Sequence, residues 1–232
     1  MKHFFAEISE RDVFPWPPGT DHWHVHALIH PVIAEHVAAA YDGLPGVTHH
    51  GEALFAPVPP QWMHITIAHL APAGELNRPE VEELRRFLID ELAPAGPVTV
   101  KIGKAREYGE HGIACPISPT GTLQRLWRAT REIAGQITAG PSLPEDYMPH
   151  LTVAYSIGDG SPVPARRWLA DHDHLLPEIP VTIDRLFLVN QRHNMREITW
   201  RVHADLPLGG TAVLLRDLPE PGPTAHDHPH GF

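Results

Sequence analysis

The chain has 232 residues, 42% of them hydrophobic and 20% charged, which is typical of a globular protein with a substantial core. Its formal net charge of −10 disfavours extended double-stranded DNA as a partner, because both surfaces are negative. The sequence contains neither an apolar run of membrane-spanning length nor the apolar core of a secretory signal, so we expect a cytoplasmic protein without a membrane partner.

The N-terminal part of the chain changes character at residue 22. Residues 1–21 are rich in proline and charge, and we expect an irregular arm there. Residues 22–30 alternate between two faces, with His24 and His26 on the same one, which predicts a strand. Pro31 then opens a predicted helix that ends near Gly43 or Gly46.

The rest of the chain mixes strands and helices without a repeating strand–helix rhythm. This order favours an α+β fold with antiparallel sheets and outer helices over a doubly wound parallel sheet. We expect one domain over residues 22–208, followed by a largely disordered tail over 209–232. The predicted strands are 63–70, 97–108, 112–117, 149–156, 179–191 and 196–208, and the predicted helices are 75–92, 122–137 and 164–172.

Two of these strands carry the same polar pattern, in the sequences MHITIAHL and PHLTVAYS. Residues i and i+2 of a strand share a face, so His64 lies beside Thr66, and His150 beside Thr152, opposite an aliphatic face. The two copies are 86 residues apart (150 − 64), which suggests two similar lobes. If the lobes are related by a pseudo-twofold axis, both pairs face one cleft.

Two imidazoles and two hydroxyls around a cleft suit phosphodiester chemistry. A neutral histidine can accept a proton from the attacking oxygen while a protonated one donates to the leaving oxygen, because an unperturbed histidine titrates near pH 6.5. The threonine hydroxyls can bind nonbridging phosphate oxygens. This scheme requires no metal and no cofactor.

The paired histidine–threonine motifs resemble those of the 2H phosphoesterase superfamily, closest to its 2′-5′ RNA ligase-like and cyclic phosphodiesterase branch. The likeness covers roughly residues 22–208 and implies a two-lobed fold with antiparallel sheets around a central cleft. It also implies hydrolysis of a 2′,3′-cyclic phosphate, or action on a 2′-5′ linkage, of a nucleotide or RNA end. By analogy His64 is the general acid and His150 the general base, while Thr66 and Thr152 bind phosphate.

Further residues near the motifs or on neighbouring strands are candidate substrate contacts. Alternation places His69 and Tyr155 on the faces opposite the motif histidines, so we interpret His69 as structural and Tyr155 as a rim residue able to stack on a base. The full set of candidate contacts is Trp62, Tyr155, His24, His26, Arg192 and His193.

Two other classes of function compete with a phosphoesterase. The first is a catalytically silent protein of the same fold that only binds a nucleotide or RNA end. The second is a metal-binding hydrolase, suggested by the 19 histidines, although the chain has a single cysteine and no His-Glu-x-x-His motif.

Overall fold

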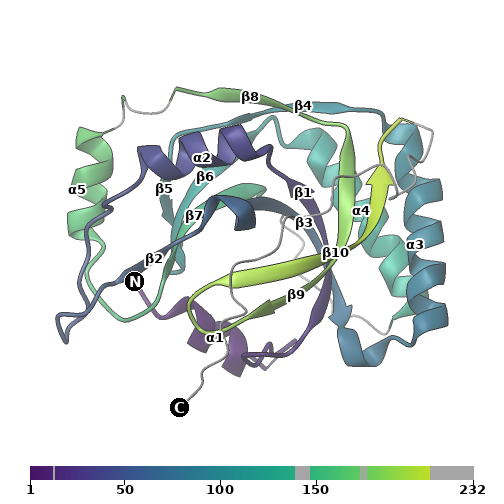
Figure 1. The fold of residues 1–232 in the computed structure, drawn as a ribbon, viewed down its shortest axis with the longest axis horizontal. Coiled ribbons are helices and arrows are strands. Elements are labelled where there is room, and N and C mark those ends of the chain that lie inside the picture. Colours follow the sequence, from purple (N-terminus) through teal and green to yellow (C-terminus); the bar gives the residue numbers. More distant parts are fainter. Residues whose placement is uncertain (13, 139–146, 173, 175–176, 210–232) are drawn as a thin grey trace, which may run out of the picture.

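The computed structural model describes residues 1–12, 14–138, 147–172, 174 and 177–209. Within these ranges ten strands form one curled antiparallel sheet in the order β10-β9-β1-β3-β7-β6-β4-β8, with β2 paired to β7 and β5 to β6 (Figure 1). The strands are β1 His22–Leu28, β2 Phe55–Pro57, β3 His64–Pro72, β4 Val98–Ile102, β5 Arg106–Tyr108, β6 Gly112–Ser118, β7 His150–Ser156, β8 Ile179–Ile183, β9 Arg185–His193 and β10 Ile198–Pro207.

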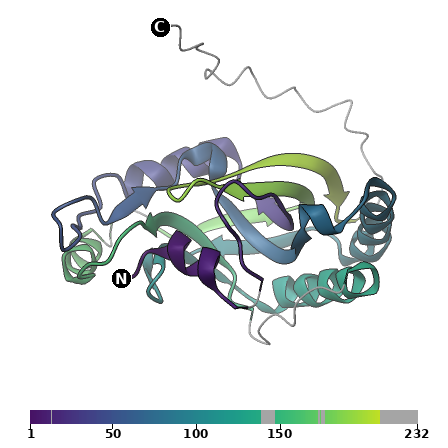
Figure 2. The same ribbon diagram turned by 90° about the horizontal axis from the view of Figure 1, so that it is seen from below.

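Five α-helices surround this sheet among the described residues. In both Figure 1 and Figure 2, α3 and α4 lie side by side at one end of the molecule, and α5 lies at the opposite end. No helix in the described ranges is long and apolar enough to cross a membrane. The helices are α1 Phe4–Glu10, α2 Pro31–Ala40, α3 Arg78–Leu92, α4 Gly121–Ile137 and α5 Val163–Asp171, with short 3₁₀ turns at Pro60–Trp62, Ala73–Glu75 and Ala93–Ala95.

Helix α3 illustrates how local sequence fixes these elements. The Asn77 side chain accepts a hydrogen bond from the Glu80 backbone N–H, and the Glu80 carboxylate accepts one from the Asn77 N–H, which together form a capping box. Its buried residues recur every three or four positions, so one face of the helix packs on the core. These residues are Val81, Leu84, Leu88 and Leu92.

The structure confirms the predicted α+β class with its antiparallel sheet around a cleft, but two predicted strands are each divided. Residues 97–108 form β4 and β5, which both pair with β6 and are separated opposite Pro116, a residue without an N–H for the ladder. Residues 179–191 divide at Asp184 into β8, which pairs with β4, and β9, which pairs with β1. The strand-like stretch 211–218 and the predicted tail beyond Gly209 lie outside the described residues.

The prediction of an irregular arm over residues 1–21 is wrong for residues 4–10, which form α1. A helix this short is unstable alone, but Phe5 and Ile8 are one turn apart and both are buried. The Phe4 ring stacks on Tyr155 of β7 with centroids 5.0 Å apart. Contact with β7, visible in Figure 2, therefore stabilises a helix that its sequence alone would not.

Candidate active site

The two motif strands, β3 and β7, are neighbours in the middle of the sheet, and Ile65 pairs with Leu151. These two residues follow the two histidines, so the pair lies on the pseudo-twofold axis that relates the motifs. One step along antiparallel strands places His64 across from Thr152, and His150 across from Thr66. Each imidazole therefore faces the hydroxyl of the other motif, and all four side chains border one cavity.

The two histidines are oriented in the same way. Nδ1 of His64 lies 2.9 Å from the carbonyl oxygen of Trp62, and Nδ1 of His150 lies 2.9 Å from that of Met148. A carbonyl only accepts, so in both rings Nδ1 carries the hydrogen and donates it. The other nitrogen, Nε2, is then free to accept or donate a proton in the cavity.

A second ring stacks on each motif histidine. The His26 ring lies 4.0 Å from that of His64 at an interplanar angle of 19°, and the Tyr108 ring lies 3.9 Å from that of His150 at 27°. Trp200 adds an edge contact to His64 at 4.6 Å. Packed rings on both sides of the cleft restrict the imidazoles to one orientation, which is a requirement for directed proton transfer.

The cavity has a volume of about 280 Å³, close to the lower end of the range for small-molecule sites. Its lining combines the four motif side chains with aromatic, aliphatic and a few charged ones. The remaining lining residues are Phe4, Glu7, Ile8, Arg11, Trp16, His69, Tyr108, His111, Gly112, Ile113, Ala114, Tyr155, Gln191 and Ile198.

His69 and Tyr155 both line this cavity, contrary to the faces that strict alternation assigned to them. The pairing of β1 with β3 skips Ile67, and the pairing of β6 with β7 skips Val153. Each skipped residue is a β-bulge, and one extra residue reverses the face of the side chains that follow. The side chain of His69 therefore lies on the same face as those of His64 and Thr66. In the same way, the side chain of Tyr155 lies on the face of His150 and Thr152. The structure therefore corrects the predicted face of His69.

Burial dominates the electrostatics of the cavity. It lowers the pKa of His64 to about 4, although the hydrogen bond to the Trp62 carbonyl opposes this shift, and His150 contributes a smaller lowering. Burial also lowers the pKa of His150, while its hydrogen bond to the Met148 carbonyl opposes that shift. For His69, burial and then the Arg11 charge lower the pKa to about 3. Without a bound anion these imidazoles are accordingly neutral at pH 7.

His24 and His26 lie on the cavity side of β1, but they do not reach the cavity. His24 pairs across the sheet with His69, and His26 with Thr66, so they share a face with the motif. Both are fully buried, and the Trp16 ring lies 5.4 Å from that of His24. Neighbouring aromatic rings pack against both, so the structure places them outside the cavity lining, and their contact with substrate stays a prediction.

Three other candidate contacts also lie outside the cavity lining. Trp62 packs against Trp200 and contributes only the carbonyl that orients His64. Arg192 forms an ion pair with Asp21 at 2.7 Å. His193 is buried, accepts a hydrogen bond from the Met195 N–H at Nδ1, and donates from Nε2 to the Trp16 carbonyl at 2.7 Å. Of the candidate contacts, only Tyr155 borders the cavity.

Sequence reasoning missed Tyr108 and the part of the cavity wall that comes from residues 4–16. A detectable signal was present in FFAEISE, where aromatic and aliphatic residues recur at helical spacing. No group of three or more histidine, cysteine, aspartate or glutamate residues in the described part of the chain is arranged to hold a metal ion.

Comparisons with known proteins agree with this architecture. Residues 30–194 match the family model of the 2′-5′ RNA ligase superfamily. E. coli LigT complexed with 3′-AMP has a similar fold, with a TM-score of 0.61, 12% identity, and coverage of 82% of this chain and 98% of that chain. TT0787 of Thermus thermophilus has a TM-score of 0.58 at 15% identity, and the match covers 82% of this chain and 100% of that chain. A structure described as a phosphoesterase has a TM-score of 0.60 at 12% identity, and the match covers 82% of this chain and 99% of that chain. No curated protein matches the chain.

Proposed function

The chain belongs to the 2′-5′ RNA ligase superfamily of 2H phosphoesterases, and on this basis we propose that it is a phosphodiesterase using two-histidine acid–base catalysis. Its substrate is a 2′,3′-cyclic phosphate, or a 2′-5′ linkage, of a nucleotide or RNA end. One observation carries the proposal: β3 and β7 present equivalent histidine–threonine pairs to one cavity, and both histidines have the same free nitrogen.

In the proposed hydrolysis, His150 acts as the base and His64 as the acid. The neutral Nε2 of His150 accepts a proton from water, and the water oxygen attacks phosphorus. The bond from phosphorus to one ribose oxygen breaks, and protonated His64 donates its Nε2 proton to that oxygen. A phosphate monoester remains, and the two histidines have exchanged protonation states. The hydroxyls of Thr66 and Thr152 donate to the nonbridging oxygens.

In this scheme, substrate binding causes His64 to take up the required proton from solvent. Without a bound anion, burial holds the pKa of His64 near 4, so the ring is neutral at pH 7. An anionic phosphate between the rings favours the charged imidazolium and raises the pKa of both histidines. Protonation of the acid is therefore coupled to binding, which reserves the reactive ionisation state for the occupied cavity.

The size of the cavity supports a nucleotide or the terminal nucleotide of an RNA as the substrate. The complex of E. coli LigT with 3′-AMP makes adenine nucleotides reasonable first ligands to test. The acidic net charge agrees with a short substrate better than with a long RNA.

Hydrolysis of adenosine 2′,3′-cyclic phosphate in the presence of EDTA tests the proposal. We expect turnover by the parent, and a loss of at least about 100-fold in His64→Ala and His150→Ala, since each removes a proton-transfer group. His36→Ala is a matched control, because His36 is exposed on α2 away from the cavity, and it should retain activity.

A chelator-sensitive activity, or one that survives both substitutions, would rule out the proposed mechanism. A 2′-5′ linked diadenosine is assayed in parallel to decide between the two linkages. Nucleotide binding by the parent without turnover of either compound would favour the silent binding protein instead.

A further inference from the structure

One wall of the cavity comes from a segment that precedes the range matched by the family model. Phe4, Glu7, Ile8, Arg11 and Trp16 all border the cavity, whereas the match begins at residue 30. The segment is anchored firmly. Phe5 is fully buried. The backbone N–H of Trp16 donates to the Ile8 carbonyl at 2.9 Å, and the Trp16 carbonyl accepts a hydrogen bond from His193. These residues therefore form a fixed part of the site.

Arg11 is the cation that this segment brings to the cavity. Its Nε donates to the Phe14 carbonyl at 2.5 Å, and its guanidinium lies 5.6 Å from the centroid of the Phe14 ring. These contacts orient the side chain, and neither terminal nitrogen hydrogen-bonds to another residue in the described part of the chain. Among the described residues, Arg11 forms no ion pair with a carboxylate. Glu7 is the one acidic side chain in the lining, and it lies 3.8 Å from Nδ1 of His111.

An arginine in this setting is suited to binding an anion. Partial burial disfavours its charge and lowers the pKa of Arg11, yet an arginine remains protonated at any physiological pH. A phosphate oxygen pair bound by the terminal nitrogens would offset the cost of desolvation, because the planar guanidinium matches phosphate in a bidentate geometry.

Ring contacts along β1 show where Arg11 lies relative to the reacting groups. The Arg11 guanidinium lies 5.6 Å from the centroid of the Phe14 ring, and that ring lies 4.9 Å from the ring of His22. His64 stacks instead on His26, with ring centroids 4.0 Å apart. His22 and His26 are four residues apart on β1, which corresponds to about 13 Å along a strand. Arg11 therefore lies toward the other end of β1 from His64, where it can contact a different phosphate.

We propose that Arg11 binds a second phosphate group of the substrate, apart from the phosphodiester held between His64 and His150. This inference rests on the proposed function and refines its substrate class. A nucleoside cyclic phosphate with no other phosphate would leave Arg11 unpaired. The preferred substrate carries a further phosphate, either a terminal one on the ribose 5′ oxygen or an internucleotide one in an RNA end.

Equilibrium binding tests the inference independently of turnover. Titration calorimetry with the full chain compares adenosine 2′,5′-bisphosphate with adenosine 2′-monophosphate, and a diadenosine ending in a 2′-phosphate distinguishes the internucleotide source. We expect the parent to prefer one of the doubly phosphorylated ligands over the monophosphate by about 10- to 100-fold, the range for a charge-assisted hydrogen-bonded pair. In Arg11→Gln that preference should fall to within about 3-fold of unity.

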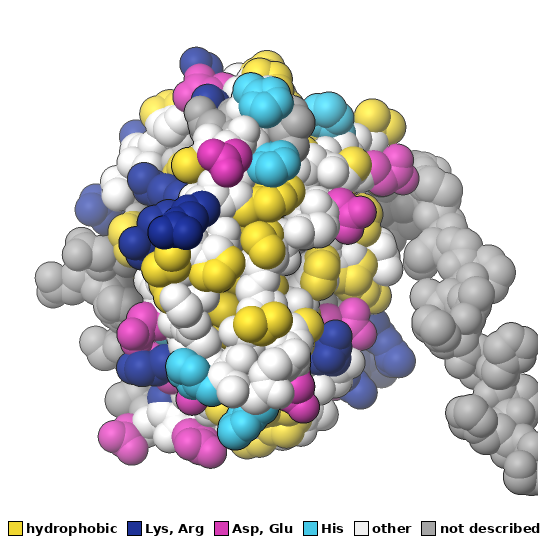
Figure 3. All heavy atoms as spheres, turned by 90° about the vertical axis from the view of Figure 1, so that its left-hand side faces the viewer, with side chains coloured by type: hydrophobic (Ala, Val, Ile, Leu, Met, Phe, Trp, Pro, Cys, Tyr) yellow, Lys and Arg dark blue, Asp and Glu magenta, His cyan; other side chains and the backbone are white. Residues whose placement is uncertain are grey.

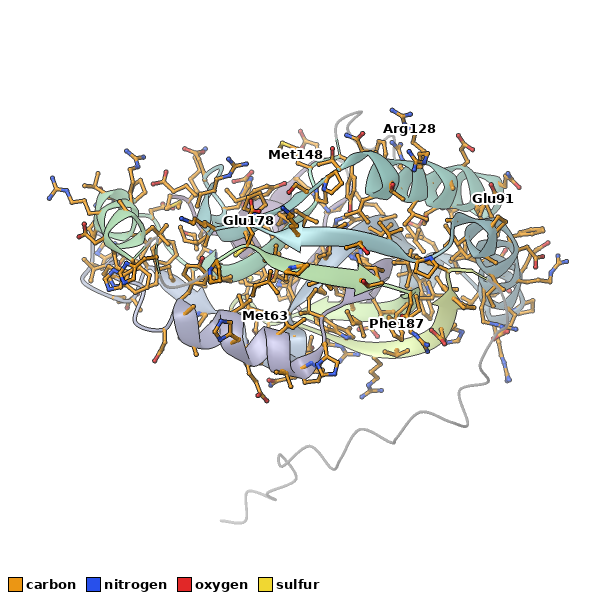
Figure 4. The ribbon with its side chains drawn as sticks, turned by 90° about the horizontal axis from the view of Figure 1, so that it is seen from above. Met63, Glu91, Arg128, Met148, Glu178 and Phe187 are labelled. Carbon is orange, nitrogen blue, oxygen red and sulfur yellow. The ribbon has the colours of Figure 1, made fainter. Side chains whose placement is uncertain are left out.

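Arg128→Gln is the matched control, because it removes the same charge from the exposed outer side of α4 (Figure 4). It should keep the preference of the parent. Arg11→Lys should restore part of it, and far-UV circular dichroism verifies that each variant is folded. A parent without preference for a second phosphate, or an equal loss in Arg128→Gln, would overturn the inference. Arg11-dependent binding without any hydrolysis would instead contradict the proposed function and leave the inference standing.

Discussion

At the scale of single residues, the site is built from two copies of one local arrangement. Each motif histidine donates from Nδ1 to the carbonyl two residues before it and packs against a second ring. Period-two alternation was sufficient to predict that His64 shares a face with Thr66, and that His150 shares one with Thr152. It failed for His69 and Tyr155, because no feature of the sequence reveals that Ile67 and Val153 are bulged.

Thr152→Val tests the phosphate-binding role at this scale. The substitution conserves shape and removes the hydroxyl, so we expect a native circular dichroism spectrum and a loss of about 10-fold or more in kcat/KM, consistent with one lost hydrogen bond to a charged oxygen. Thr152→Ser should recover most of the rate. Thr99→Val, at an exposed position on β4, controls for a general effect of the substitution. An unchanged rate in Thr152→Val would remove this residue from the mechanism.

At the scale of elements, the pairing of β6 with β7 requires a glycine at one position. Gly112 of β6 pairs with Tyr155, just past the bulge at Val153, and a Cβ at this position would overlap the carbonyl oxygen of Ala154. The role of this glycine follows only from the pairing of two strands that are distant in sequence. The sequence predicted strands over residues 97–108 and 112–117, whose adjoining parts pair as β5 and β6, but nothing in it singled out Gly112.

Gly112→Ala should therefore destabilise the fold and disturb the cavity wall. We expect a loss of about 1–3 kcal/mol in the free energy of unfolding, since the obstructing atom belongs to the backbone and cannot rotate away. Urea denaturation measures this loss. Gly121→Ala, at the start of α4 with no atom within 4 Å of the added Cβ, should stay within about 0.5 kcal/mol of the parent. Equal stability of the two variants would mean that β6 and β7 are not so close.

At the scale of the whole molecule, composition and element order were enough for the fold class, but not for the complete site. The antiparallel α+β architecture followed from the order of strands and helices along the chain. The N-terminal wall did not, because α1 depends on packing against β7. The net charge of the chain also does not describe the local charge of its surface. Lysine and arginine side chains gather locally on the face of the molecule that Figure 3 shows. Arg106 of β5 and Arg167 of α5 are both exposed.

The central claim is that two histidines with opposite protonation states act together on one phosphate. The pH dependence of kcat/KM for adenosine 2′,3′-cyclic phosphate tests it most directly, because this parameter reports the free enzyme. Catalysis requires a protonated acid and a neutral base, so the rate should fall at both ends of the range. Burial lowers the pKa of His64 and of His150, so the maximum should lie below pH 6.5, in the range where circular dichroism still shows a folded protein. A bell-shaped profile with that maximum is the predicted result, and a flat profile between pH 5 and 8 would contradict the account.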